Sequence, residues 1–192
     1  MQVLVNGEQA YPAMIQAIDA AIETIGFASY IFNHCPVGLE FVDAFRRPIN
    51  RGIEVRVLVD STGSRYSRPS ISKALKASQI PCARFLPFSA IKRPLTLNLH
   101  KHRKLLIVDG RVGFAGGMSI RQGHFINGKS KHRVQDLHFS FEGPSQLIFR
   151  KCLMMTGFSV MVRNAAGKNG FLPLSIKERL LLAVFQTVPM RI

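Results

Sequence analysis

A histidine, a lysine and an aspartate follow one another at a fixed spacing near the middle of the chain. His102, Lys104 and Asp109 form the pattern H-x-K-x-x-x-x-D. An imidazole can act as a nucleophile or as an acid or base near neutral pH. A neighbouring ammonium can bind a phosphate oxygen and stabilise the charge that develops during displacement. These residue types therefore indicate phosphoryl-transfer chemistry that needs no metal.

Small and polar residues that follow the pattern suit the same chemistry. Gly116 and Gly117 would let backbone amides approach a phosphate closely, and the Ser119 hydroxyl can donate to it. Asp109 lies in a turn, where its carboxylate can fix either basic groups or the turn backbone. We expect Gly116, Gly117 and Ser119 to bind phosphate.

The apolar run 105–108 positions the motif. It predicts a buried strand, whose side chains alternate between the two faces of a sheet. His102 and Lys104 would then point the same way, about 6–7 Å apart along the backbone, where the buried run begins at the edge of the sheet.

Two weaker interpretations of the histidines compete with a catalytic one. A single histidine in a basic loop is usually solvated, and the three-residue pattern alone arises often by chance. His100 and His102 are also candidate metal ligands, but no acid or thiol lies nearby on the approach to them. We therefore expect no metal and no cofactor.

The hydrophobic patterning around the motif alternates between strand and helix periods. At 192 residues, one domain is the default. The order β-α-β-α-β-α-β ahead of the motif predicts an α/β layered sheet with right-handed crossovers. The expected strands are 3–5, 25–32, 53–59, 82–86, 105–108, 112–115 and 135–141, and the expected helices are 11–24, 39 to Pro48, 70–78 and Pro144 to about 155.

Charge is distributed unevenly along the chain. Lys and Arg number 26 against 11 Asp and Glu, for a formal net charge of +15, yet residues 1–45 contain no Lys or Arg. Between Lys92 and Arg133 the only acid is Asp109. This pattern indicates a polyanionic partner, either nucleic acid or an anionic lipid surface. The competing interpretation is a solvated basic surface.

The sequence gives no sign of a membrane-spanning or exported segment. Its first residues lack a basic region followed by an apolar run, and no stretch of about 18 apolar residues occurs. The three cysteines show no C-x-x-C spacing, which favours reduced thiols in a cytoplasmic setting.

The motif and its surroundings together resemble the HKD motif of the phospholipase D superfamily, in its bacterial cardiolipin synthase branch. The resemblance rests on residues 102–111 and 114–120, and extends to Asn6-Gly7-Glu8, Tyr30-Ile31-Phe32, residues 51–60, Asp136-Leu137-His138-Phe139 and Glu142-Gly143-Pro144. It covers roughly residues 1–153. It implies a layered α/β/α domain with a mixed sheet flanked by helices.

The resemblance also implies a reaction and roles for the residues. In such enzymes a motif histidine attacks the phosphodiester to form a phosphohistidine, and the other motif's histidine protonates the leaving alcohol. By position, His102 would be the nucleophile or its acid partner, Lys104 a phosphate ligand and Asp109 the supporting acid. Asp136 resembles the acid that orients the histidine through its other ring nitrogen. Ser119 stands where the family usually has Asn, which replaces two donors by one.

The implied substrate is an anionic phospholipid such as phosphatidylglycerol, at a membrane surface. The acceptor would be an alcohol, which gives cardiolipin synthesis, or water, which gives hydrolysis. The chain would be cytoplasmic or peripheral to the inner face of the cell membrane. One alternative is a homodimeric, metal-independent phosphodiesterase or nuclease, and another is a catalytically silent remnant that binds anionic lipid or nucleic acid.

The family builds its active site from two HKD motifs, whereas this chain carries one. Either a homodimer supplies the second motif, or the chain is half of an enzyme. Read two bases later, the codons of residues 154–157 can encode Asp-Asp-Trp, the segment that the family has here, although the chain contains no Trp. We therefore expect a phospholipase D-like domain at 1–155 and an atypical tail at 156–192 that is disordered or the product of a frameshift. The alternative is a genuine divergent tail with a dimer helix at 176–184.

Overall fold

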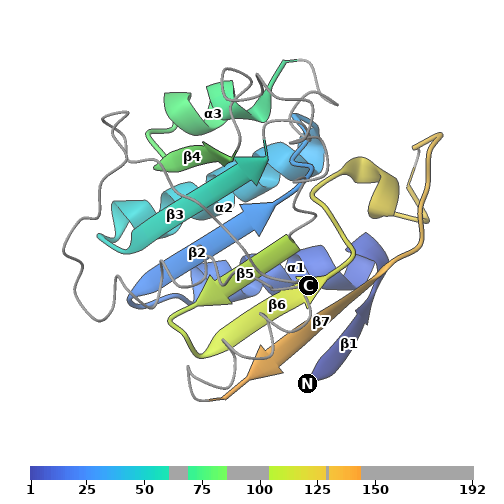
Figure 1. Ribbon diagram of the computed structural model, residues 1–192, viewed down its shortest axis with the longest axis horizontal. Helices are drawn as coiled ribbons and strands as arrows, with labels where there is room; N and C mark the ends of the chain where they lie inside the picture. Colours follow the sequence, from blue (N-terminus) through green and yellow to red (C-terminus); the bar gives the residue numbers. More distant parts are fainter. Residues whose placement is uncertain (61–68, 86–103, 129, 144–192) are drawn as a thin grey trace, which may run out of the picture.

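A mixed seven-stranded sheet forms the centre of the protein (Figure 1). The structure is a computed structural model that describes residues 1–60, 69–85, 104–128 and 130–143. Its strands are β1 (Gln2–Val5), β2 (Thr24–Ser29), β3 (Glu54–Asp60), β4 (Cys82–Phe85), β5 (Lys104–Val108), β6 (Val112–Gly116) and β7 (Leu137–Glu142). The helices are α1 (Asn6–Asp19), α2 (Pro36–Asn50), α3 (Ile71–Ala77) and the short 3-10 helix η4 (Gln122–His124).

The strand order is β1-β7-β6-β5-β2-β3-β4. β2, β3 and β4 run parallel, and the remaining neighbours pair antiparallel. The predicted alternation of strands and helices up to β4 is correct, and so are the α/β class and the mixed sheet. β1 and β2 are consecutive in sequence but are not neighbours in the sheet. The chain leaves the edge strand β1, passes through α1 and enters β2 in the middle of the sheet.

The helices α1, α2 and α3 pack on one face of the sheet, and α1 and α2 lie behind the strands in Figure 1. Their apolar side chains form the main core with those of the sheet, centred on the aromatic rings of Tyr11, Phe27, Phe41 and Phe45. A smaller buried cluster on the opposite face contains Ala28, Leu105, Ile107, Ala115 and Phe141. The helix expected from Pro144 and the tail from 156 lie outside the described residues.

Two helix boundaries differ from the predicted ones. The first helix begins at Asn6 rather than Tyr11, because Asn6 adopts a left-handed φ of +58° and turns the chain from β1 directly into α1. Asparagine tolerates this conformation better than most residues. The second helix begins at Pro36, and Pro48 lies in its last turn without ending it at once, since α2 runs to Asn50.

β2 is shorter than predicted and ends at Ser29. The chain then leaves the sheet, and Phe32 forms an isolated bridge with Ile120, with Ile120 N–H donating to Ile31 O at 3.0 Å and Asn33 N–H donating to Ile120 O at 2.9 Å. These bonds hold the segment after β2 against the segment after β6.

Two further expectations from the sequence concern the cysteines and membrane-spanning helices. Cys35 and Cys82, the cysteines in the described part of the chain, form no disulfide there. Within the described residues, no helix has the length and apolar character needed to cross a membrane.

Candidate active site

The ends of six strands meet at one edge of the sheet. Opposite Ser29, the last residue of β2, lies Lys104, the first of β5, and Gly116, the last of β6, lies opposite His138 near the start of β7. β3 ends at the same edge, and so does β1, where Val5 is opposite Leu137. Open α/β sheets bind their ligands outside the carboxyl ends of parallel strands. Since β2 and β3 end here, this edge is the expected ligand site.

Lys104 is the described motif residue that lies at this edge. Its side chain is on the helix-covered face, the same side as Leu106, and it is only 8% exposed. Its Nζ lies 5.6 Å from the centre of the Tyr30 ring, within range of a cation–π interaction. Burial lowers the pKa of Lys104, and the charge of Asp136 opposes that shift. His102, two residues earlier in the chain, lies outside the described residues.

Asp136 reaches the same edge from the segment before β7. Its backbone is held by Asn6, whose Oδ1 accepts the Asp136 N–H at 3.1 Å and whose N–H donates to Asp136 O at 3.0 Å. Its carboxylate Oδ1 accepts the Leu137 N–H at 2.8 Å. The predicted site residues Lys104 and Asp136 are thus brought to one edge from segments 32 positions apart in the chain.

Gly116 and Gly117 lie close against the start of β7. The Gly117 N–H donates to Leu137 O at 3.0 Å, which holds the end of β6 against β7. A Cβ at Gly117 would lie 2.1 Å from Asp136 Oδ1, and one at Gly116 would lie 2.7 Å from His138 Nδ1. The two glycines therefore make room for the side chains of Asp136 and His138.

Asp109 is not brought to the edge. It lies at the other end of β5, where its carboxylate accepts the N–H groups of Ile22, Glu23 and Thr24 at 2.7–2.9 Å. This arrangement is the turn-fixing alternative that the sequence left open. Ser119 is at the site edge and buried, with 3% exposed, and its backbone carbonyl accepts the Tyr11 hydroxyl at 2.7 Å.

Comparison with known proteins identifies the family. The family model described as "Cardiolipin synthase, PLD-like domain" matches residues 14–131, which is more than half of the chain. The chain belongs to this phospholipase D-like family. The predicted family and fold are therefore confirmed.

Individual phospholipase D-like proteins show how much of a relative this chain represents. Cardiolipin synthase 1 of Bacillus anthracis is 31% identical over 142 residues, 74% of this chain and 28% of that protein. The cardiolipin synthase of Geobacillus sp. (strain WCH70) is 29% identical over 83% of this chain and 33% of its own length. The chain thus spans about a third or less of the curated relatives it matches.

Solved structures show the same phospholipase D-like fold. Nuc of Salmonella typhimurium superposes with a TM-score of 0.57 at 18% identity, covering 80% of this chain and 91% of Nuc. The phosphatidylserine synthase of Haemophilus influenzae gives the same TM-score at 17% identity, but only 34% of that chain is covered.

Sequence reasoning about this phospholipase D-like chain missed three buried polar residues at the site. Tyr11 is 1% exposed and ties α1 to the segment after β6 by donating to Ser119 O and accepting the Arg121 N–H at 3.4 Å. Burial raises the pKa of its hydroxyl. His124 is 4% exposed, its Nδ1–H donates to Val134 O at 3.2 Å, and burial lowers its pKa.

His138 is the third of these residues. It is 1% exposed, and neither ring nitrogen has a hydrogen-bond partner within the described part of the protein. Burial, reinforced by the nearby His124 and Lys104, lowers the pKa of His138 to about 4. The sequence did contain one signal for His138. It lies two residues after Asp136, and alternate residues of a strand share a face.

We expect His138 to make folding sensitive to acid. Between the ordinary pKa of 6.5 and the folded value of about 4, the unfolded chain holds a proton on this imidazole that the folded chain lacks. The free energy of unfolding should therefore fall by about 3 kcal/mol as the pH drops from 7 to below 4. Urea unfolding of the parent and of His138→Leu across this range measures the effect.

The control for this experiment is His132→Leu, which removes an exposed histidine. The His138→Leu chain should lose less stability on acidification than either the parent or this control. Equal acid sensitivity in all three would contradict the assignment. At pH 7 His138→Leu should be at least as stable as the parent, because two unpaired buried polar atoms are removed.

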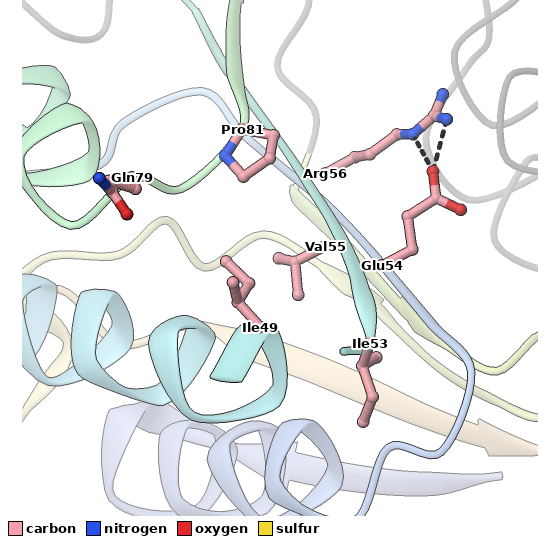
Figure 2. Close-up of a pocket in the computed structure, with 7 residues that line it drawn as sticks. All are labelled: Ile49, Ile53, Glu54, Val55, Arg56, Gln79 and Pro81. Carbon is pink, nitrogen blue, oxygen red and sulfur yellow. Dashed lines mark hydrogen bonds and ion pairs between the residues drawn. The ribbon is translucent and has the colours of Figure 1, made fainter. Parts of the chain in front are cut away.

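A pocket elsewhere in the described structure is not part of this site (Figure 2). It has a volume of about 370 Å³ and lies at the beginning of β3, the opposite end of that strand from the site edge. The ion pair of Arg56 with Glu54 points away from the apolar side chains. Its lining residues are Ile49, Ile53, Glu54, Val55, Arg56, Gln79 and Pro81. Within the described residues, no three His, Cys, Asp or Glu side chains are grouped to hold a metal ion.

Proposed function

We propose that this chain supplies one half of a phospholipase D-type active site that transfers a phosphatidyl group through a phosphohistidine on His102. The observation that carries the proposal is the convergence of Lys104, two residues after His102 in sequence, and Asp136 at the carboxyl edge of the sheet. Membership of the family supports it, since its model carries the cardiolipin synthase description.

The proposed reaction needs two histidines, His102 as the nucleophile and the histidine of a second motif as the acid. An imidazole nitrogen of His102 attacks phosphorus, and the bond between phosphorus and the leaving alcohol oxygen breaks. That oxygen takes its proton from the second motif's histidine, supplied by a second copy or by the other half of a longer enzyme. The oxygen of an acceptor alcohol or water then attacks phosphorus, the bond between phosphorus and the His102 nitrogen breaks, and the acceptor's proton returns to that second histidine.

The described residues support this reaction through charge and orientation. The Lys104 ammonium binds a non-bridging phosphate oxygen and is strengthened by its low-dielectric surroundings. The Asp136 carboxylate accepts the other ring N–H of His102 and so fixes the tautomer that attacks. Ser119 offers a single hydroxyl donor, and Asp109 acts at a distance by fixing the turn after β5.

The proposed substrate is an anionic phospholipid resembling phosphatidylglycerol, handled at the inner face of the cell membrane without a cofactor. The test is to incubate the purified chain, without added metal, with vesicles of headgroup-phosphate-labelled phospholipid. We expect label on the protein, and cardiolipin or phosphatidic acid as product. Both should disappear in His102→Asn, while Lys73→Gln, at an exposed position of α3 away from the site edge, should behave as the parent does.

A homodimeric phosphodiesterase acting on nucleic acid is the second candidate. The observation that favours it is the formal net charge of +15, because clustered Lys and Arg side chains bind the phosphate backbone of nucleic acid. Cleavage of plasmid DNA by a dimer on a sizing column, lost in His102→Asn, would support this candidate over lipid transfer. Turnover by a strict monomer would contradict the need for a second motif, and binding without turnover would identify a silent remnant.

A further inference from the structure

The connection between β6 and β7 carries a strongly basic surface beside the candidate site. No Asp or Glu occurs between Asp109 and Asp136, and the exposed side chains of Lys131, His132 and Arg133 lie in the second half of this connection. In Figure 1 the connection projects beyond the same edge of the sheet at which β1 ends and β7 begins. Its cations therefore lie close to the edge where Lys104 and Asp136 meet.

Exposed apolar side chains adjoin these cations. Val134 follows Arg133 directly and is 43% exposed. Val5 and Leu137, each 44% exposed, are cross-strand partners at the ends of β1 and β7. Since β1 is the edge strand of the sheet, this apolar pair and the basic segment form one border of the molecule.

The basic segment is held in place by hydrogen bonds to the folded domain. Val134 N–H donates to Gly123 O at 2.9 Å, and the buried His124 donates to Val134 O. Earlier in the same connection, Asn127 N–H donates to the Glu8 carboxylate in α1 at 2.9 Å. The segment is therefore ordered before any partner binds, which reduces the entropy cost of docking.

We propose that Lys131, His132, Arg133 and Val134, together with Val5 and Leu137, form a docking surface for an anionic phospholipid bilayer, here called the β6–β7 surface. Cations attract the charged headgroups, and the apolar side chains enter the interface. The combination favours a membrane over nucleic acid, because a phosphate backbone offers no counterpart for three exposed aliphatic side chains. This proposal rests on the proposed lipid substrate and names the surface that presents it to the site.

The test measures binding of the full chain to phosphatidylglycerol vesicles by sedimentation at low salt, independently of turnover. In Lys131→Gln/Arg133→Gln, two cations near the surface are removed at about 1 kcal/mol each, so partitioning should weaken about 30-fold. The matched control is Lys73→Gln/Lys76→Gln, which removes the same charge from exposed positions of α3 next to the opposite edge strand. It should weaken partitioning several-fold less.

A second pair of variants tests the apolar half of the surface. Val5→Thr/Val134→Thr keeps the shape and strand preference of valine but replaces a methyl with a hydroxyl. It should weaken vesicle binding several-fold and leave plasmid DNA binding unchanged. The proposal is overturned if the Gln pair is no weaker than its control, or if the Thr pair has no effect on vesicles while the Gln pair weakens DNA binding equally.

The outcomes separate this surface from the proposed chemistry. If the Gln and Thr pairs lose vesicle binding but no chain forms labelled protein or product, the surface stands and the proposed function fails. If turnover depends on His102 but vesicle binding is unaffected by these changes, the function stands and the surface fails.

Discussion

Replacing Lys104 by methionine is expected to lower kcat/KM for the phosphodiester by about 100- to 1,000-fold while leaving the chain folded. Loss of one charge-stabilising donor from a preorganised site typically has this effect. Lys104 is suited to that role because it is 8% exposed at the edge of the sheet, where little water screens its charge.

Stability should change in the opposite direction from activity, or not at all. Burial lowers the pKa of Lys104, which means that the folded protein holds this ammonium at a cost. Methionine has a similar length, removes that desolvation and remains among apolar neighbours. We therefore expect a urea midpoint equal to or higher than that of the parent.

Lys104→Arg is the informative companion variant. It keeps the positive charge but brings a larger, planar guanidinium into a buried position, so it should recover only part of the activity. Lys73→Met, at an exposed position of α3, controls for the loss of one lysine. Unchanged kcat/KM in Lys104→Met, or unfolding of that chain at 25 °C, would contradict the role assigned here.

Local patterns in the sequence predicted most of the elements that surround the site. In residues 53–59, apolar β-branched side chains occupy every second position, and the segment forms β3 at Glu54–Asp60. The Asp109-Gly110-Arg111 turn joins β5 to β6 with positive φ at Asp109 and Gly110, +52° and +62°, a conformation that Asp and Gly tolerate better than most residues. These features depend on neighbouring residues, which is why a single sequence carries them.

Long-range pairing is what the sequence did not show. Val3 pairs with Phe139 across more than 130 positions, and nothing local in either strand specifies that partner. The role of Tyr11 was missed for the same reason. Its ring fits the apolar face of α1, but its hydroxyl donates to Ser119 O, which is distant in sequence. His138 was quoted only within the family resemblance, because its burial depends on the opposing Gly116.

The spacing of the HKD pattern shows the same difference between what local sequence specifies and where the residues lie in the fold. Lys104 and Asp109 are five residues apart on an extended strand, about 17 Å from one end of β5 to the other. The spacing of the pattern therefore corresponds to the length of one buried strand, with Lys104 at one end and an acid that fixes the turn at the other. Chemistry inferred from residue type alone would assign both to one site.

Asp109→Ala should consequently destabilise the chain without altering the chemistry of the molecules that remain folded. The carboxylate accepts N–H groups from Ile22, Glu23 and Thr24, and its own N–H donates to Thr24 O at 2.8 Å. Hydrogen bonds to a charged group are stronger than neutral ones, but two of these donors are exposed and can bind water instead. Alanine also tolerates the left-handed φ of +52° poorly.

Together these effects should lower the free energy of unfolding of Asp109→Ala by about 3 kcal/mol in urea titrations. Asp109→Asn should lose about 1 kcal/mol, because its amide oxygen still accepts hydrogen bonds and asparagine tolerates the left-handed conformation. Asp43→Ala, which breaks only an exposed ion pair with Arg46 in α2, is the matched control and should stay within about 0.5 kcal/mol of the parent. Turnover per folded molecule of Asp109→Ala should match the parent within about twofold, since the change is a strand's length from Lys104. A loss of turnover as large as that of Lys104→Met in a chain that remains fully folded would instead place Asp109 in the reaction.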